Sequence, residues 1–167
     1  MDESPAQHQW RRWLDDHAPG FLLFARQKAR CEADAQDLVQ EAIIESSRRI
    51  GNGGPPPLAL VYATIHRRAI DWARADHRRM ERDATAHSNA PQVWFDTTVE
   101  DRERANLVQD AMSRLPEIYR EVVILKLWAG LTFAEIADSL SIPANTAASR
   151  YRYGLEQLRR LTREVLT

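Results

Sequence analysis

The stretch GLTFAEIADSLSIPANTAASRYRYGL, residues 130–155, carries the local signals of two short helices joined by a tight turn. Thr132 and Glu135 have the spacing of a capping box, which predicts the start of the first helix. Pro143 predicts the start of the second, because a proline at this position has no N–H group to leave unpaired. Ser141 lies in the turn, where glycine is the residue that best tolerates a positive φ. The pattern is typical of a helix-turn-helix.

The outward face of the second helix is polar and basic. In a helix-turn-helix, the first turns of this helix enter the major groove, where amide, hydroxyl and guanidinium groups bond base edges and phosphates. An ordinary solvated face of a helical bundle is the alternative. The residues expected to contact DNA are Asn145, Thr146, Ala148, Ser149, Arg150 and Arg152.

Helical periodicity extends over the rest of the chain, and no strand pattern appears. An apolar stripe from Trp10 to His17 predicts a first helix, which we expect to end at Pro19-Gly20. Asp34 is placed to cap the next helix by accepting a hydrogen bond from its free N–H groups. The three glycines and three prolines within residues 51–57 exclude a helix there.

Residues 83–97 are small and polar and lack a sustained period, which predicts a flexible linker between two helical domains. Trp94 and Phe95 are unusual in such a segment, and we expect them either to pack on a domain or to meet a partner. The expected fold class is all-α, with one small domain at residues 1–82 and another at 98–167.

The formal net charge of −1 conceals two basic segments. Residues 60–82 hold six Arg against three acids, and residues 144–163 hold five Arg against one. Lysine occurs only at positions 28 and 126. Because the planar guanidinium suits phosphates and guanine edges, this distribution favours a nucleic-acid partner held at two places.

The helix expected from Leu58 to about Arg82 divides into two faces. Its core stripe comprises Leu58, Val61, Tyr62, Ile65, Ala69 and Trp72. Its outer edge carries Arg67, Arg74, Arg78 and Arg82, with Asp71 placed to form weak ion pairs with the first two. Four arginines over roughly 22 Å favour a contact with a nucleic-acid backbone, and a purely solvated face is the alternative.

The helix from about residue 34 to residue 50 has a mixed outer face. Its buried stripe is expected to contain Leu38, Val39, Ala42, Ile43 and Ser46. An isoleucine among polar and acidic groups suits the docking of a partner, although single exposed isoleucines are also common. The residues of this face are Asp37, Gln40, Glu41 and Ile44.

Other classes of protein receive no support from the sequence. Cys31 is the only cysteine, which excludes an internal disulfide and a thiolate zinc cluster. The five histidines show no metal-ligand spacing, and no apolar run approaches the ~20 residues of a membrane span. The N-terminus lacks the features of a signal peptide. We expect a cytoplasmic protein that is not an enzyme, needs no cofactor or metal and does not insert into a membrane.

Three segments carry a more specific likeness: DAQDLVQEAI at 34–43, VYATIHRRAIDWARADHRR at 61–79, and LPEIYREVVILKLWAGLTFAEIADSLSIPANTAASRYRYGLEQLRR at 115–160. Together they resemble the sigma factors of bacterial RNA polymerase, of the short extracytoplasmic-function (ECF) group. The resemblance implies a region 2-like first domain and a region 4-like second domain. It also implies a promoter-specificity subunit that works with core RNA polymerase, with an anti-sigma protein as a further expected partner.

Individual roles are implied by the same resemblance. Asp37, Gln40, Glu41 and Ile44 would dock on the coiled coil of the largest polymerase subunit. The helix after residues 51–57 would recognise and help open the minus-ten promoter element, through Tyr62, Arg67, Arg74, Arg78 and Arg82. The loop at 51–57 would capture an unstacked base, but it contains no aromatic side chain. Tyr62 is the nearest one, with base stacking and burial both open to it.

The helix-turn-helix would recognise the minus-thirty-five element, so that the chain would contact both duplex and locally melted promoter DNA. Ala148 stands where many members of the family carry a basic residue, and its methyl group suits contact with a thymine methyl.

Two other functions remain open. A sigma-like decoy would bind only an anti-sigma protein, and a stand-alone helix-turn-helix regulator would need neither the docking face nor the arginine edge.

Overall fold

The computed structural model describes residues 4–80 and 93–166, in which every regular element is a helix. These residues form two compact units, one within Met1–Gln92 and one within Val93–Thr167. The prediction of an all-α fold is therefore confirmed. The expected linker at 83–97 and the last arginine of the predicted edge, Arg82, lie largely or wholly outside the described residues.

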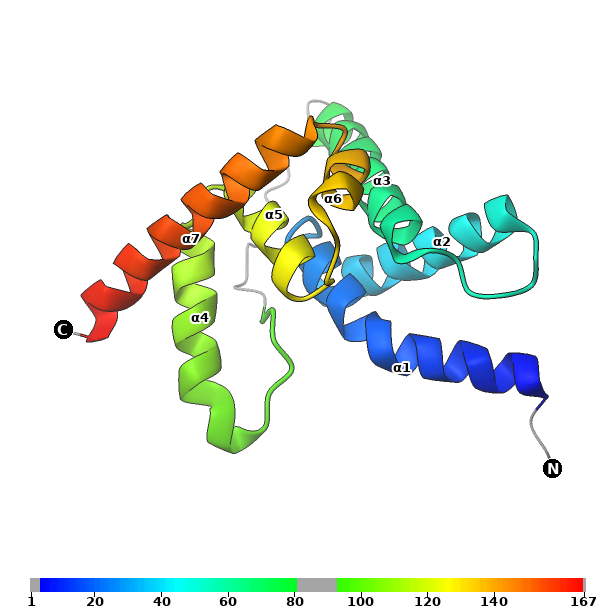
Figure 1. The fold of residues 1–167 in the computed structure, drawn as a ribbon, viewed down its shortest axis with the longest axis horizontal. Coiled ribbons are helices and arrows are strands. Elements are labelled where there is room, and N and C mark those ends of the chain that lie inside the picture. The colour runs from blue at the N-terminus through cyan, green and yellow to red at the C-terminus, as the bar shows by residue number, and fades with distance from the viewer. Residues whose placement is uncertain (1–3, 81–92, 167) are drawn as a thin grey trace. The chain divides into compact units, whose positions relative to one another are not determined.

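The first unit is built from α1 (Pro5–Arg26), α2 (Glu32–Ile50) and α3 (Leu58–Met80). Helices α2 and α3 pack side by side, and α1 packs against both of them (Figure 1). The predicted stripes of α2 and α3 form much of the core, except that Ile43, Leu58 and Trp72 are only partly buried. The largest fully buried side chains of this unit are Tyr62, Phe21, Phe24, Leu38, Ile65 and Val61.

The predicted end of α1 at Pro19 is wrong, because the helix continues through this proline to Arg26. A proline in a helix interior costs about 3 kcal/mol. Of the four large apolar side chains that follow at 21–24, Phe21, Leu23 and Phe24 are 0%, 4% and 0% exposed. Since each fully buried side chain of this size contributes about 1.5–3 kcal/mol, burial outweighs the local break.

The predicted cap at Asp34 is also wrong. Helix α2 begins at Glu32, and Asp34 lies inside its first turn, where a negative charge favours the helix dipole. The buried guanidinium of Arg26 donates to both carboxylate oxygens of Glu32, each at 2.8 Å. This paired contact, rather than a side-chain cap, ties the start of α2 to the end of α1.

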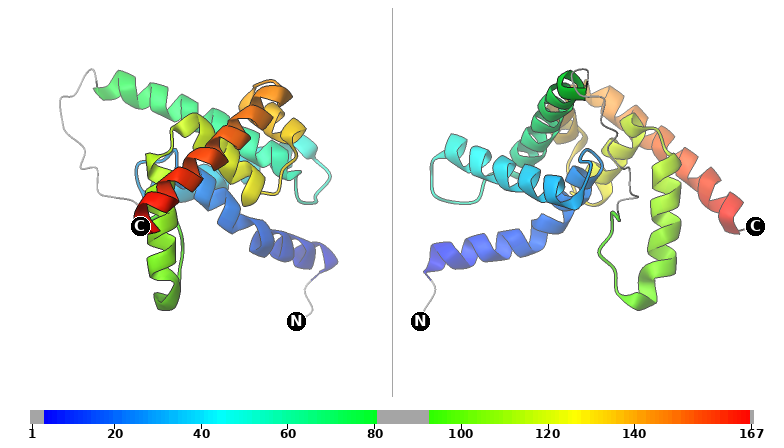
Figure 2. Two further views of the ribbon diagram at one scale, coloured as in Figure 1. Left: turned by 60° about the vertical axis from the view of Figure 1, so that its left-hand side comes forward. Right: turned by 180° about the vertical axis from the view of Figure 1, so that it is seen from behind.

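The second unit contains a short 3₁₀ turn, Val99–Asp101, followed by α4 (Arg102–Arg114), α5 (Glu117–Leu127), α6 (Phe133–Leu140) and α7 (Ala144–Leu166). Helix α7 packs on α4, α5 and α6, and Figure 2 shows it crossing α5. A Cβ atom on Gly154 would lie 2.9 Å from Cγ2 of Val123, which is fully buried. Gly154 therefore sets how closely α7 approaches α5.

Trp94 and Phe95 pack within the second unit, which was one of the two alternatives. The backbone N–H of Trp94 donates to the side chain of Gln109 at 2.9 Å, and the guanidinium of Arg120 lies 5.3 Å from its ring. The ring of Phe95 lies 5.8 Å from that of Trp128. The chain just before α4 is thus held against α4 and α5.

Candidate nucleic-acid interface

The helix-turn-helix has the local geometry that its sequence predicts. The backbone N–H of Glu135 donates to the Thr132 hydroxyl at 3.2 Å, and the N–H of Thr132 donates to the Glu135 carboxylate at 2.7 Å. Ser141 adopts the left-handed conformation at φ 56°, so a residue other than glycine holds this turn. Ala147, at the helix crossing, is 0% exposed.

The first turns of α7 border an open hollow of about 430 Å³. Four of the residues predicted to contact DNA line it together with two tyrosines that were not predicted. The rings of Tyr119 and Tyr153 lie 4.6 Å apart, and Tyr153 is 47% exposed. Tyr153 follows Ser149 by four residues, so helical spacing alone places both on one face. The lining residues are Tyr119, Asn145, Thr146, Ser149, Arg150 and Tyr153.

The other two predicted residues of α7 do not line this hollow. Arg152 is exposed, and Ala148 is partly exposed. Tyr119 comes from α5, so no spacing within one helix indicates its contribution. The structure therefore brings together a continuous surface of amide, hydroxyl, guanidinium and phenol groups at the start of α7.

The arginine edge of α3 is only partly available. Arg74 and Arg78 are exposed, and Nε of Arg78 donates to the carbonyl oxygen of Arg74 at 3.3 Å. Arg67 is 52% exposed, but its guanidinium is paired with Glu45 of α2 instead of with Asp71. In the described part of the edge, Arg74 and Arg78 have no acidic partner from α2, whereas Arg67 is paired with Glu45.

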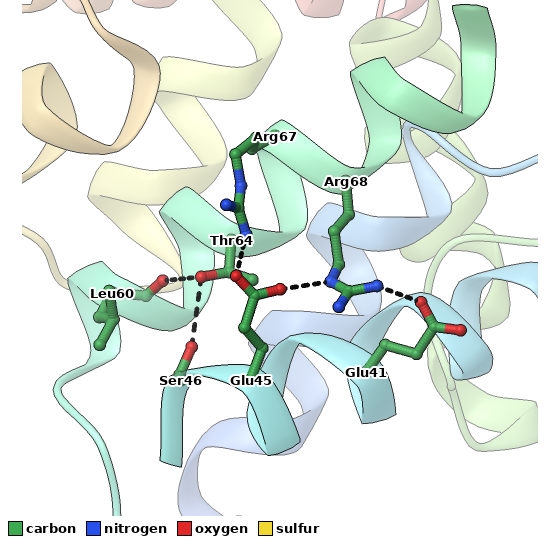
Figure 3. A network of polar contacts seen from close by, with 7 residues as sticks. All are labelled: Glu41, Glu45, Ser46, Leu60, Thr64, Arg67 and Arg68. Carbon is green, nitrogen blue, oxygen red and sulfur yellow. Dashed lines mark hydrogen bonds and ion pairs between the residues drawn. The ribbon is translucent and has the colours of Figure 1, made fainter. Parts of the chain in front are cut away.

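Glu45 is the centre of a polar network between α2 and α3 (Figure 3). Its carboxylate accepts hydrogen bonds from Arg67 and, at 2.7 Å, from Nε of Arg68. Nη1 of Arg68 also donates to Glu41 at 2.6 Å. The hydrogen bond from Arg67, with further help from Arg68, lowers the pKa of the Glu45 carboxyl against the opposing effect of burial. The network joins the expected docking helix to the expected DNA-binding helix.

A buried pair of hydroxyls lies beside this network. The hydroxyls of Ser46 and Thr64 share a hydrogen bond at 3.3 Å, and the Thr64 hydroxyl also donates to the carbonyl oxygen of Leu60 at 2.7 Å. Because Ser46 and Thr64 are buried, these bonds satisfy polar groups that would otherwise destabilise the core. They also fix the register of α2 against α3.

The expected docking face on α2 is present, with one difference. Ile44 is 50% exposed, and Asp37 and Gln40 are exposed. Glu41 is partly covered because it pairs with Arg68. The mixed apolar and polar face is therefore centred on Ile44, and Glu41 serves the contact between α2 and α3 as well.

Of the two roles left open to Tyr62, the structure shows burial, so its listing among the minus-ten contacts is wrong. Its side chain is 2% exposed and lies between the rings of Phe21, at 4.9 Å, and Phe24, at 5.5 Å. Burial raises the pKa of its phenol. Tyr62 is a core residue, so it offers no surface to a freed base.

Three further observations concern the described residues alone. Within residues 4–80 and 93–166, no group of three or more His, Cys, Asp or Glu side chains has the arrangement of a metal site. No helix among them is both long enough and apolar enough to cross a membrane. Cys31 is exposed.

Comparison with known proteins matches each of the two units to a protein family. Residues 13–79 match the family Sigma-70 region 2, and residues 105–158 match the family Sigma-70, region 4. The ECF RNA polymerase sigma factor SigL of Mycobacterium tuberculosis is 27% identical over 158 residues, covering 93% of this chain and 89% of SigL. SigK of Mycobacterium ulcerans is 32% identical over 107 residues, covering 62% of this chain and 57% of SigK.

The fold has a counterpart among solved structures. The chain is similar, with a TM-score of 0.67 and 18% identity, to the sigma factor RpoE from Bartonella quintana, solved in complex with the anti-sigma factor NepR. The match covers 92% of this chain and 96% of that one. Two sigma-70 regions in order, in a chain matched over nearly its whole length by an ECF sigma factor, show that it belongs to the ECF group of sigma factors, the promoter-specificity subunits of bacterial RNA polymerase.

Proposed function

We propose that this chain docks on core RNA polymerase through the Ile44 face of α2 and contacts promoter DNA through α3 and α7. The observation that supports this assignment is a mixed apolar and polar face on α2 together with two arginine-bearing helices, α3 and α7, on two separately packed units. The first domain, region 2-like and at residues 1–82, would dock on polymerase and recognise the minus-ten element. The second, region 4-like and at residues 98–167, would recognise the minus-thirty-five element, and residues 83–97 would join the two.

Docking uses Asp37, Gln40, Glu41 and Ile44 against the coiled coil of the largest polymerase subunit. An exposed isoleucine supplies apolar contact area at the centre of an interface, and the surrounding polar groups supply orientation. The exposed fraction of Ile44, 50%, supports this choice of centre. Glu41 contributes from the edge of the face, where Arg68 holds it.

Recognition of the minus-ten element rests on Arg74 and Arg78, with Arg67 earlier on the same edge of α3. Arg82, which lies outside the described residues, is a further expected contact. Arginines along one helix edge neutralise successive phosphates and release their counterions, which makes binding dependent on salt. Arg67 must leave Glu45 or share its guanidinium with that carboxylate when it contacts a phosphate.

Recognition of the minus-thirty-five element uses the first turns of α7. Asn145, Ser149 and Arg150 border the hollow at which base edges are read, and Arg152 contacts the backbone or a guanine. Thr146 adds a hydroxyl to the hollow, and Ala148 offers a methyl group to a thymine.

The chain performs no bond-making chemistry in this proposal, so it is a regulatory subunit and not an enzyme. Unpairing of the duplex is offset by the capture of single-stranded bases on a basic surface. Because core polymerase and the chromosome are its partners, its place of action is the cytoplasm. A sigma factor of similar fold has been solved with an anti-sigma factor, which supports an anti-sigma protein as a further partner of this chain.

Reconstitution with purified core polymerase followed by footprinting tests this function. The chain is expected to elute with core polymerase on gel filtration. The complex is then expected to protect two separate blocks of promoter DNA, one for each unit. A decoy would bind an anti-sigma protein but protect no DNA, and a stand-alone regulator would protect one block without core polymerase.

A further inference from the structure

The loop at residues 51–57 is contacted by an aromatic side chain from a distant part of the sequence. Nε1 of Trp10, on α1, donates a hydrogen bond to the carbonyl oxygen of Gly53 at 2.9 Å, across 43 positions of the chain. The loop itself contains only Gly, Asn and Pro, and Tyr62 is buried in the core. Trp10 therefore supplies the loop with the aromatic ring that its own sequence lacks.

The ring of Trp10 is anchored to the core by a series of aromatic contacts. Trp10 and Trp13 meet edge to face with ring centres 5.6 Å apart, and Trp13 lies 5.4 Å from Phe21. Phe21 in turn lies 4.9 Å from Tyr62. A partly exposed indole held in this way loses little conformational freedom when a ligand stacks on it.

Trp10 borders a hollow that is open to solvent. This hollow, of about 440 Å³, lies on α1 and is lined by Trp10 together with Ala6, Gln7, Arg11, Leu14 and Asp15. Small-molecule sites commonly occupy about 300–1,000 Å³. The hollow therefore has room for a planar base beside the indole.

Positive charge lies near this position on two helices. The hollow is lined by one guanidinium, that of Arg11, and one carboxylate, that of Asp15, and Arg48 and Arg49 are exposed in the last turn of α2, just before the loop. An aromatic platform combined with basic side chains is the arrangement by which proteins hold single-stranded nucleic acid. The same positive charge opposes the binding of a cationic ligand.

We propose that the indole of Trp10 is the stacking surface for an unpaired base of single-stranded promoter DNA, next to the loop at residues 51–57. The proposal rests on the function proposed above and adds to it a residue of α1. The hydrogen bond from Trp10 to Gly53 keeps the loop beside the indole. The hollow itself is lined by residues of α1.

The test compares Trp10→Ala, Trp10→Phe and the exposed α1 control His8→Ala in holoenzyme reconstituted with core polymerase. The probe is a promoter selected from a random pool and prepared with its minus-ten region already unpaired. Trp10→Ala is expected to weaken binding about 5- to 100-fold, and Trp10→Phe, which keeps a ring, by about threefold or less. His8→Ala is expected to bind as the wild type does.

A second measurement separates stacking from a loss of folding. An abasic nucleotide is placed at each position of the unpaired non-template strand in turn. At the stacked position it should weaken the wild type and leave Trp10→Ala unchanged, so the two bind equally there. A duplex carrying only the upstream element, which the second unit binds, should bind all variants equally.

Three results would overturn the proposal: equal binding of wild type and Trp10→Ala to the unpaired promoter, equal losses in Trp10→Phe and Trp10→Ala, or no abasic position that removes their difference. In each of these cases the wild-type holoenzyme still forms and binds. Failure of the wild type itself to assemble with core polymerase or to bind any promoter would instead refute the proposed function, and this proposal with it.

Discussion

The carboxylate of Glu45, on α2, accepts a hydrogen bond at 2.7 Å from Nε of Arg68, on α3. The same carboxylate also holds Arg67, the first arginine of the expected DNA-binding edge. A single acidic residue thus connects the helix proposed to dock on polymerase with the helix proposed to bind the minus-ten element. The proposed function requires a fixed relative position of the two helices, because one would be bound to polymerase while the other is bound to DNA.

Glu45→Gln is expected to destabilise the first unit by about 1 kcal/mol at neutral pH, since it removes a charge paired with two guanidinium groups. Arg67 and Arg68 lower the pKa of Glu45 in the folded state. The stability that this pairing contributes is therefore present above the ordinary pKa range of a carboxyl. It is lost as the pH falls through the lowered value.

Thermal unfolding of wild type and Glu45→Gln between neutral and acidic pH measures this effect. The difference between them should narrow as the pH falls. Glu156→Gln is the matched control, because its partner Arg160 lies on the same helix, both side chains are exposed, and such pairs contribute only about 0.3–0.5 kcal/mol. A pH-independent difference for Glu45→Gln would show that the pairing is not the cause.

Ile44→Arg is expected to abolish binding to core polymerase while leaving the fold intact, because Ile44 is half exposed and lies on the outer face of α2. A charge at the centre of an apolar contact disrupts it. Pull-down with core polymerase measures binding, and circular dichroism checks the fold. Unchanged capture of Ile44→Arg would remove α2 from the docking surface.

Glu41→Arg is expected to behave differently. It adds a third guanidinium to those of Arg67 and Arg68. Arg68 also loses one of its two carboxylate partners, the Glu41 carboxylate at 2.6 Å. We therefore expect both weaker polymerase binding and a lower unfolding temperature from this variant. An unfolding temperature equal to that of the wild type would indicate that the pair of Glu41 and Arg68 contributes nothing to the packing of α2 on α3.

Replacing Arg150 and Arg152 by Ala is expected to weaken promoter binding and to reduce the slope of log affinity against log salt by up to ~2. For each phosphate contact that is removed, binding releases about one counterion fewer. The control is the double replacement of Arg159 and Arg160, which are exposed further along α7. A salt slope equal to that of the wild type after the first replacement would exclude both residues from the interface.

Gly154→Ala is expected to destabilise the second unit by about 1–3 kcal/mol, the range observed for overpacked cores. Its methyl group would meet the buried side chain of Val123 at 2.9 Å, so α7 would have to move away from α5. The gain in helix propensity, up to about 1 kcal/mol, offsets only part of this cost. Chemical denaturation measures the change, and a variant more stable than the wild type would contradict the close crossing.

The helix-turn-helix was predictable because its signals are local. Thr132 and Glu135 are three residues apart, and the structure shows both hydrogen bonds of their capping box. The residues of the α7 surface follow from helical spacing, which depends only on positions within one helix. Tyr119 was missed because it reaches this surface from α5.

The wrong predictions for the first unit arose because contacts between helices override local signals. Pro19 is a local signal for the end of a helix, but the burial of Phe21 and Phe24 against α2 and α3 overrides it. The pairing of Glu45 with Arg67 joins residues 22 positions apart, and that of Trp10 with Gly53 joins residues 43 apart. Such contacts depend on how the helices pack, which no spacing within a helix reveals.

In vitro transcription with purified chain, core polymerase and a pool of random promoter DNA tests the central claim most directly. The chain is expected to direct initiation at a subset of the pool that shares two sequence elements, and Ile44→Arg is expected to abolish this transcription. Transcripts that are identical with and without the chain, from unselected sequences, would contradict its assignment as a promoter-specificity subunit.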